Sequence, residues 1–150
     1  MEAVVLVGVQ GSGKSTYYAE NFADTHLRLN RDMLRTVERE AVLMHACLAT
    51  RQAFVIDNTN PKRSSRARYL AAAKAAGFRT VAISFELPVE LALARNAQRE
   101  GKARVPDRAI YGTMAKLEPV EDSEGFDELR VIRPEAALRG AADASAEVSS

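Results

Sequence analysis

The sequence predicts an α/β fold with a mostly parallel sheet of about five strands. Short continuous apolar runs, such as AVVLV at residues 3–7 and AFVI at residues 53–56, are typical of strands buried on both faces. Segments with helical spacing of apolar residues separate these runs, and strands that alternate with helices usually pair in parallel. The 150 residues suit one compact domain.

In the first half of the chain, a strand at residues 3–7 precedes a helix over residues 14–23. A second strand is expected at residues 26–29, because the chain must return between two helices. Apolar residues then recur at spacings of three and four, which predicts one continuous amphipathic helix over residues 32–52.

The second half repeats the pattern, with a third strand at residues 53–56. Asn60 and Pro61 offer a helix N-cap and a first helical residue, and Gly77 would end that helix. The remaining expected elements are the strand at 80–85, a helix from Pro88, a basic loop at 102–106, a helix at 107–117 and a strand at 129–132.

Composition narrows the class of protein. The formal net charge of +1 excludes a uniformly basic nucleic-acid coat but allows a local basic patch. No apolar run approaches the roughly 20 residues of a membrane-spanning helix, no secretory leader is visible, and Cys47 alone forms no internal disulfide. We expect a cytoplasmic protein without membrane contact, folded over residues 1–134, with a flexible Ala/Ser/Glu-rich tail at 135–150.

The strongest motif is GVQGSGKS at residues 8–15, which fits G-x-x-x-x-G-K-[ST] between a strand and a helix. Gly11 and Gly13 let successive backbone N–H groups point at phosphate oxygens. Lys14 would reach the β- and γ-phosphates, and the Ser15 hydroxyl would ligate Mg²⁺. An ordinary Gly-rich turn is the alternative, but the register of strand, glycines, Lys and Ser favours a nucleoside triphosphate site.

A second motif, NRDMLR, follows the second strand. Asp32 would lie in the first turn of its helix, with Arg35 one turn later on the same face. Such a carboxylate can take a proton from an attacking hydroxyl group. The alternative is that Asp32 complements the helix dipole and Arg35 is a surface charge.

A third motif, DNTN, follows the third strand, and Asp57 stands where a carboxylate would hold Mg²⁺ or its waters. A turn or cap role is the alternative. In an open parallel sheet, ligands bind beyond the carboxyl ends of the strands. The motifs at residues 8–15, 30–35 and 57–60 follow three successive strands, so we expect them to face one crevice.

A basic segment contains Arg95 and Arg99, four residues apart, followed by Lys102, Arg104 and Arg108. Such a segment can close over phosphates and neutralise developing charge. Taken alone, the segment is better explained as a solvated helix flank, partly balanced by Glu100 and Asp107.

The ordered motifs GVQGSGKST, NRDMLR, DNTNP and ARNAQREGKARVP resemble the kinase domain of polynucleotide 5′-hydroxyl kinases, over about residues 4–132. The resemblance implies a P-loop kinase fold with helices on both faces of the sheet. It implies transfer of the γ-phosphate of ATP, or of another NTP, to 5′-OH ends of DNA or RNA in nucleic acid repair. Val9-Gln10 departs from the family, where many members have Pro before the glycine, and the lid (residues 100–104) differs in length from some members.

The resemblance also implies residue roles. Lys14 binds phosphate, Asp32 is the general base, and Arg35 grips the phosphate beside the acceptor nucleotide. Arg95 and Arg99 bracket the lid, and Arg99 contacts the ATP phosphates. The expected catalytic residues are Lys14, Asp32, Arg35 and Arg99, and the expected metal ligands are Ser15 and Asp57. The expected nucleotide-binding residues are Gly8, Gly11, Ser12, Gly13, Lys14, Ser15, Thr16, Arg95 and Arg99.

Two other functions fit the same motifs. A P-loop kinase of a small metabolite, such as a sugar or nucleoside, agrees equally well with the near-neutral charge. A nucleotide-dependent binding or switch protein is the second, although a pure switch needs no hydroxyl base beside its loop.

Overall fold

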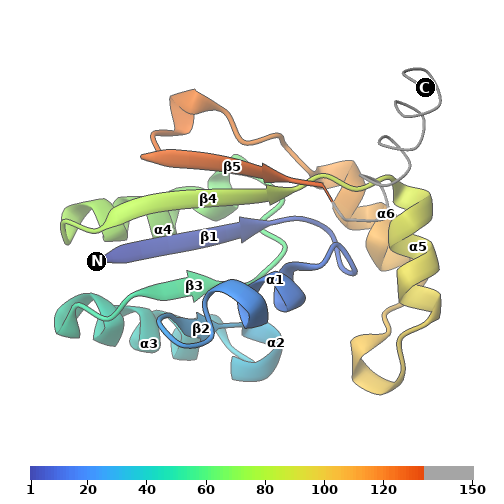
Figure 1. The fold of residues 1–150 in the computed structure, drawn as a ribbon, viewed down its shortest axis with the longest axis horizontal. Coiled ribbons are helices and arrows are strands. Elements are labelled where there is room, and N and C mark those ends of the chain that lie inside the picture. Colours follow the sequence, from blue (N-terminus) through green and yellow to red (C-terminus); the bar gives the residue numbers. More distant parts are fainter. Residues whose placement is uncertain (134–150) are drawn as a thin grey trace, which may run out of the picture.

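The computed structural model describes residues 1–133, which form a five-stranded sheet in the order β2-β3-β1-β4-β5 (Figure 1). The strands are β1 (Glu2–Val7), β2 (Leu27–Leu29), β3 (Phe54–Ile56), β4 (Arg79–Phe85) and β5 (Glu128–Ile132). All four strand pairings are parallel. The predicted α/β fold is confirmed, and its strand ends all point to one edge.

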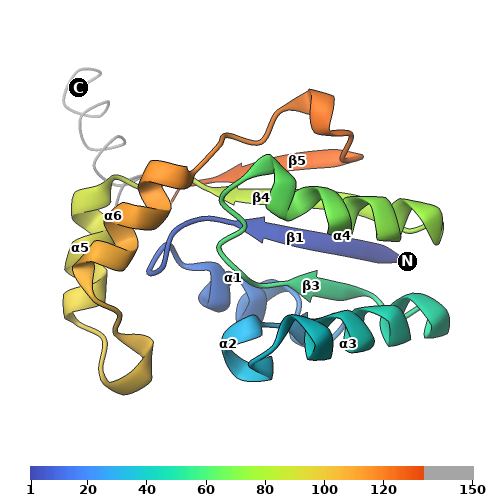
Figure 2. The ribbon, with the colours of Figure 1, turned by 180° about the vertical axis from the view of Figure 1, so that it is seen from behind.

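Helices cover both faces of the sheet, as the resemblance implied. The helices are α1 (Lys14–Asn21), α2 (Arg31–Leu34), α3 (Val37–Thr50), α4 (Arg63–Ala75), α5 (Val89–Ala97) and α6 (Asp107–Lys116), with short 3-10 turns η1 (Gly101–Ala103) and η2 (Asp122–Glu124). Seen from behind, α3 and α4 lie in front of the sheet, and α1 lies on its other face (Figures 1 and 2). No helix in residues 1–133 is long and apolar enough to cross a membrane.

The central strand β1 divides the core into two layers. Val5 and Val7 face α3 and α4, where they pack with Cys47 and Tyr69. Val4 and Leu6 face the side of α1, and both are fully buried. Burying each such side chain stabilises the fold by about 1.5–3 kcal/mol, so the sheet is a rigid base for the loops at its carboxyl edge.

The helix expected over residues 32–52 is wrong as one element, because the chain breaks it at Arg35. Arg35 has φ 77°, and Thr36 is extended and caps α3, its hydroxyl accepting from Arg39 N at 3.1 Å. A threonine hydroxyl stabilises a helix start better than a helix interior, which the apolar spacing alone does not register.

The cap predicted at Asn60 is also wrong. Lys62 is the N-cap of α4, and Asn60 has φ 45°. The buried Asn60 amide instead donates to Leu6 O at 2.8 Å and ties the loop after β3 to β1. Gly77 follows the end of α4 with φ 77°, as expected of a residue that ends a helix.

Helices α5 and α6 form a separate small layer beyond the carboxyl edge of the sheet. Ala92 and Ile110 pack against Val9 of the glycine-rich loop. The lid joins these two helices, and most of its residues are exposed. The tail predicted at residues 135–150 lies outside the described residues.

Candidate active site

The loop at residues 8–15 has the backbone that its glycines predict. Gly11 and Gly13 have φ values of 80° and 99°, which L residues with a side chain rarely adopt. A Cβ on Gly8 would lie 2.8 Å from Ser12 Oγ and 3.0 Å from Phe85 Cβ, so close packing also requires glycine there. The loop therefore turns sharply into the N-terminus of α1, where backbone N–H groups and the helix dipole favour an anion.

Lys14 lies inside this loop with its ammonium group largely out of water. Its Nζ donates to Gly8 O at 2.7 Å and to Val9 O at 2.8 Å. The pKa of Lys14 is lowered to about 8, chiefly by burial and also by the charge of Arg99, while the charges of Asp57 and Asp32 oppose the shift. Asp57, Asp32 and Arg99 come from three distant parts of the chain and line the same cavity as Lys14.

Ser15 and Asp57 meet at the carboxyl edge of the sheet, 42 residues apart in sequence. Ser15 Oγ lies 3.2 Å from Asp57 Oδ2, and the Asp57 side chain is 2% exposed. Arg28 bridges the pair, with Nε 2.7 Å from Asp57 Oδ2 and a terminal nitrogen 3.1 Å from Ser15 Oγ. Sequence reasoning did not identify Arg28, since an arginine in a three-residue strand carries no distinguishing pattern.

These residues fit Mg²⁺ shared with a triphosphate. Mg²⁺ prefers oxygen ligands and usually takes one or two from the protein and the rest from phosphates and water. Ser15 and Asp57 supply a hydroxyl and a carboxylate side by side. Residues 1–133 contain no group of three or more His, Cys, Asp or Glu side chains suited to hold a metal by themselves.

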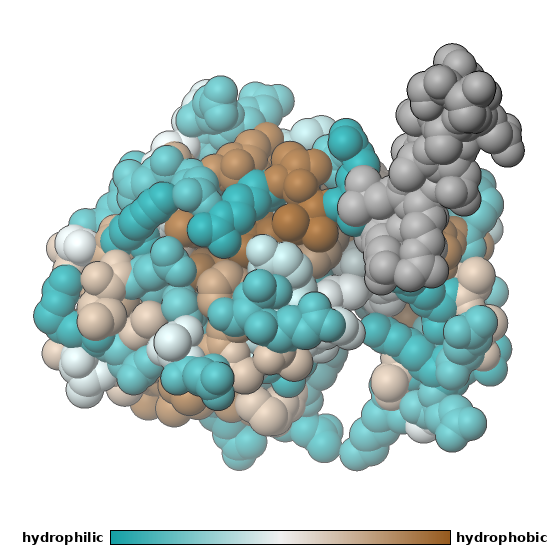
Figure 3. All heavy atoms as spheres, viewed as in Figure 1, coloured by the Kyte–Doolittle hydropathy of each residue, from teal (hydrophilic) through white to brown (hydrophobic). Residues whose placement is uncertain are grey.

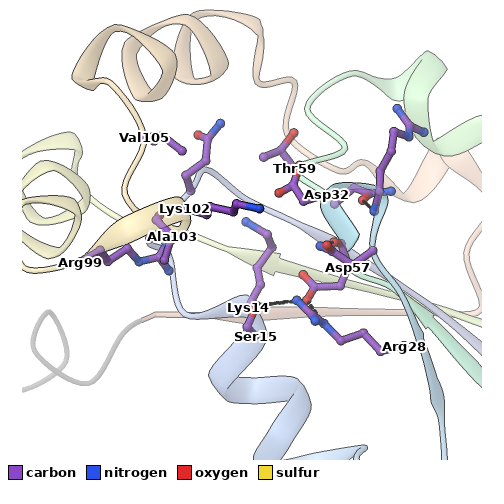
Figure 4. A pocket seen from close by; sticks show the side chains of 15 residues that line it. Lys14, Ser15, Arg28, Asp32, Asp57, Thr59, Arg99, Lys102, Ala103 and Val105 are labelled. Carbon is purple, nitrogen blue, oxygen red and sulfur yellow. Dashed lines mark hydrogen bonds and ion pairs between the residues drawn. The ribbon is translucent and has the colours of Figure 1, made fainter. Parts of the chain in front are cut away.

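The three motifs and the lid enclose one cavity of about 640 Å³ (Figure 4). Its lining residues are Gln10, Gly11, Lys14, Ser15, Arg28, Asn30, Arg31, Asp32, Asp57, Asn58, Thr59, Arg99, Lys102, Ala103 and Val105. The expected common crevice is therefore present. The space-filling view shows the indentation that separates the lid side from the rest of the molecule (Figure 3).

Asp32 lines this cavity, whereas Arg35 does not. Asp32 lies in the first turn of α2 and is exposed. Arg35 follows the end of α2 with a positive φ, so the expectation that both share one helix face is wrong. Arg35 is the C-cap residue of α2, and its side chain is exposed.

Of the two arginines near the lid, Arg99 lines the main cavity and an adjacent one, whereas Arg95 lines only the adjacent one. Helix α5 ends at Ala97, so Arg99 lies beyond the helix, and its guanidinium donates to Ala103 O at 3.2 Å. Arg95 approaches the other side of the glycine-rich loop, 3.4 Å from Gly11 O. It lines an adjacent cavity of about 380 Å³, whose lining also includes Ser12, Gly13, Thr16 and Arg99.

Arg31 and Asn58 also line the main cavity, although the motif analysis assigned them no role. Arg31 lies between the cap Asn30 and Asp32, and Asn58 follows Asp57. Both reach Glu40, a buried carboxylate of α3. Motifs in the sequence do not reveal this role of Arg31 and Asn58, because their shared partner Glu40 belongs to another element and meets them only in the folded chain.

Comparison with known proteins identifies the family of this chain and several relatives. Residues 24–120 match a family model described as AAA domain. The bifunctional polynucleotide phosphatase/kinase of Schizosaccharomyces pombe is 29% identical over 138 residues, covering 83% of this chain and 32% of that protein. A putative bifunctional polynucleotide phosphatase/kinase of Acanthamoeba polyphaga mimivirus is 35% identical over 94 residues, covering 61% of this chain and 22% of that protein. The resemblance drawn from the motifs is confirmed.

The chain spans about a third or less of the length of these curated relatives. Among solved structures, a sugar kinase from Janibacter sp. HTCC2649 aligns with a TM-score of 0.66 at 21% identity. The alignment covers 95% of this chain and 92% of that one. The P-loop kinase fold is thereby shown.

Proposed function

The chain belongs to the AAA domain family, and on that premise we propose that it transfers the γ-phosphate of ATP, or of another NTP, to 5′-OH ends of nucleic acid. One observation carries the proposal. Asp32 lines the same cavity as Lys14, and its charge acts on the Lys14 ammonium. A carboxylate in the same cavity as a phosphate-binding lysine can orient an acceptor hydroxyl and accept its proton, as the catalytic Asp of kinases does.

The proposed roles follow the geometry around the cavity. Backbone N–H groups of the loop and Lys14 hold the triphosphate, and Ser15 and Asp57 hold Mg²⁺, which neutralises phosphate charge when bound. Asp32 orients the acceptor hydroxyl and takes its proton. Arg99 and Lys102 stand on the lid side of the cavity, where cations stabilise charge on the transferred group.

The choice of a nucleic acid acceptor is supported by the two curated relatives, both named for polynucleotide substrates. It is also supported by the cations Arg28, Arg31 and Lys102, which line the cavity together with Asp32. An acceptor with a phosphate next to its hydroxyl brings a negative charge to this cationic lining, which a neutral sugar does not.

The test is transfer of labelled γ-phosphate from ATP with Mg²⁺ to four acceptors: a 5′-OH oligonucleotide, a nucleoside 3′-phosphate, gluconate and water. We expect the oligonucleotide to be the best acceptor and the nucleoside 3′-phosphate to be second. Preferred transfer to gluconate would establish a small-metabolite kinase instead. Release of phosphate to water alone would establish a nucleotide-dependent switch.

A further inference from the structure

Glu40 is a buried carboxylate at which four parts of the chain meet. It lies on α3 and is 2% exposed. Its Oε1 accepts from the Tyr69 hydroxyl at 2.5 Å and from Arg31 at 3.2 Å, and its Oε2 accepts from Asn58 Nδ2 at 2.7 Å. These partners come from α4, from α2 and from the loop after β3.

Glu40 determines which way the Asn58 amide points. Burial acts to raise the pKa of Glu40, but the hydrogen bonds from Tyr69, Asn58 and Arg31 outweigh burial and lower it. The ionised carboxylate only accepts hydrogen bonds, so Asn58 must turn its NH₂ group toward it. The amide oxygen of Asn58 then faces the other way and accepts from the backbone N of Arg31 at 2.9 Å.

That last bond matters because α2 is too short to hold its own position. It comprises four residues, and a single helical turn is unstable by itself. The positive φ of Arg35 interrupts the chain directly after it. The start of α2 is held by two bonds to the loop after β3: Arg31 N to Asn58 Oδ1, and Asn30 Nδ2 to Asp57 O at 2.6 Å.

We propose that Glu40 is a positioning residue for the acceptor side of the cavity. Through Asn58 and Arg31 it holds α2, and with α2 the carboxylate of Asp32, at a set distance from the glycine-rich loop. The proposal rests on the proposed function in one respect, that Asp32 acts as the general base. The positioning itself is a property of the chain without substrate.

The first test variant is Glu40→Gln, which keeps the size and removes acceptor capacity on one side. The new NH₂ group has to face either Tyr69 and Arg31 or Asn58, all of which donate to that position. If it faces Asn58, that amide must turn over and lose its bond to Arg31 N. In the double variant Glu40→Gln/Asn58→Asp, the carboxylate introduced at position 58 accepts from the NH₂ group introduced at position 40 and from Arg31 N. The bond that holds the start of α2 is thereby restored.

Two measurements test the positioning role of Glu40. Hydrogen exchange of the amides of α2 should rise in Glu40→Gln and return toward the wild-type rate in the double variant. With a 5′-OH oligonucleotide, kcat should fall by about 10²-fold in Glu40→Gln, because small misplacement of a catalytic group has costs of that order. The Kd for nucleotide should stay unchanged, and the double variant should recover part of kcat.

Glu124→Gln is the matched control. Glu124 is a carboxylate with a side chain 3% exposed, and it pairs with Arg66 of α4 at 2.8 Å, but no bond connects it to α2. This variant should lose stability without faster exchange in α2 and without a change in kcat. Equal effects of the two variants, or unchanged exchange in Glu40→Gln, would overturn the positioning role.

The two proposals fail separately. If wild type does not phosphorylate 5′-OH ends, the proposed function is wrong, and the exchange measurement still decides the positioning role. If wild type does phosphorylate them and Glu40→Gln keeps full kcat, the positioning role is overturned and the function stands.

Discussion

Arg28 Nε lies 2.7 Å from Asp57 Oδ2, so the carboxylate proposed to hold Mg²⁺ already has a cationic partner from the neighbouring strand. The Arg28 side chain is 30% exposed and the Asp57 side chain 2% exposed, and both residues line the cavity. A divalent cation that binds Asp57 must share this carboxylate with the guanidinium or displace it.

Removal of Arg28 should therefore tighten metal binding. An ion pair of this exposure is worth about 0.2–1 kcal/mol, so Arg28→Gln should lower the Kd for Mn²⁺ by up to about five-fold. The measurement is a Mn²⁺ titration by electron paramagnetic resonance with a non-hydrolysable ATP analogue. Arg79→Gln removes an arginine from a 2.7 Å pair with Glu128 and serves as the control. Weaker Mn²⁺ binding in Arg28→Gln would contradict the competition.

Lys14→Met should lower phosphate transfer by about 10²–10³-fold, the usual effect of removing one preorganised donor from a charged transition state. Lys62→Met, at an exposed position outside the cavity, is the control. Circular dichroism of both variants checks that the fold is intact. Wild-type transfer by the Lys14 variant would remove the glycine-rich loop from the mechanism.

Asp32→Asn keeps the size of the side chain but cannot accept the proton. Because general base catalysis contributes about 10²–10⁴-fold, kcat should fall by that order while the Kd for ATP changes little. Glu38→Gln alters another exposed acid in a first helical turn, outside the cavity, and should have no effect. Normal turnover of Asp32→Asn would leave Asp32 as a helix-terminal charge.

Variants of Arg35 separate the effect of its strained backbone from the function of its side chain. Its φ of 77° is unfavourable for any residue with a Cβ, so Arg35→Gly should raise the free energy of unfolding by about 1 kcal/mol. If its guanidinium grips an acceptor phosphate, the same variant should raise the KM for oligonucleotide, and Arg35→Lys should restore the KM only in part. The measurements are urea denaturation and initial rates. An unchanged KM for oligonucleotide in Arg35→Gly would show that the Arg35 guanidinium does not bind the acceptor phosphate.

Glu124 should make the fold acid-sensitive. Burial acts to raise the pKa of Glu124, but the hydrogen bonds from Arg66 and from the backbone of Glu121, together with the charges of Arg66 and Arg63, outweigh it and hold the pKa below the ordinary value of 4.5. The pair therefore stabilises the protein fully above pH 4.5, and this stabilisation is lost as pH falls through the lower pKa of the folded state. The stability gap between wild type and Glu124→Gln, from urea midpoints, should be narrower at low pH than at neutral pH. A constant gap would contradict the assignment.

Much of the framework was predictable from neighbouring residues. The apolar run of β1, the glycines with positive φ and the Lys-Ser start of α1 act over a few residues, so their sequence pattern and their structure correspond directly. Parallel pairing then brings the carboxyl ends of β1, β2 and β3 to one edge. That rule alone predicted the common crevice of the three motifs.

The errors arose where a side chain bonds to a distant part of the chain or to a competing local cap. Asn60 has the composition of a helix cap, but its amide donates to Leu6 O, 54 residues away. The apolar spacing across Arg35 indicated one helix, but the Thr36 hydroxyl begins a new one. In both cases the side chain makes a hydrogen bond that composition and apolar spacing do not register.

By itself, the sequence determined the parallel α/β fold, the phosphate-binding loop and the strand ends that carry the polar motifs. Only the tertiary structure decided that Arg28 bridges Ser15 and Asp57, that Arg35 lies outside the cavity, and that Glu40 connects α2, α3, α4 and the loop after β3. The physical reason is the range of the interactions. Periodicity and turn preferences act between near neighbours, whereas a buried charge takes its partners from whichever elements pack around it.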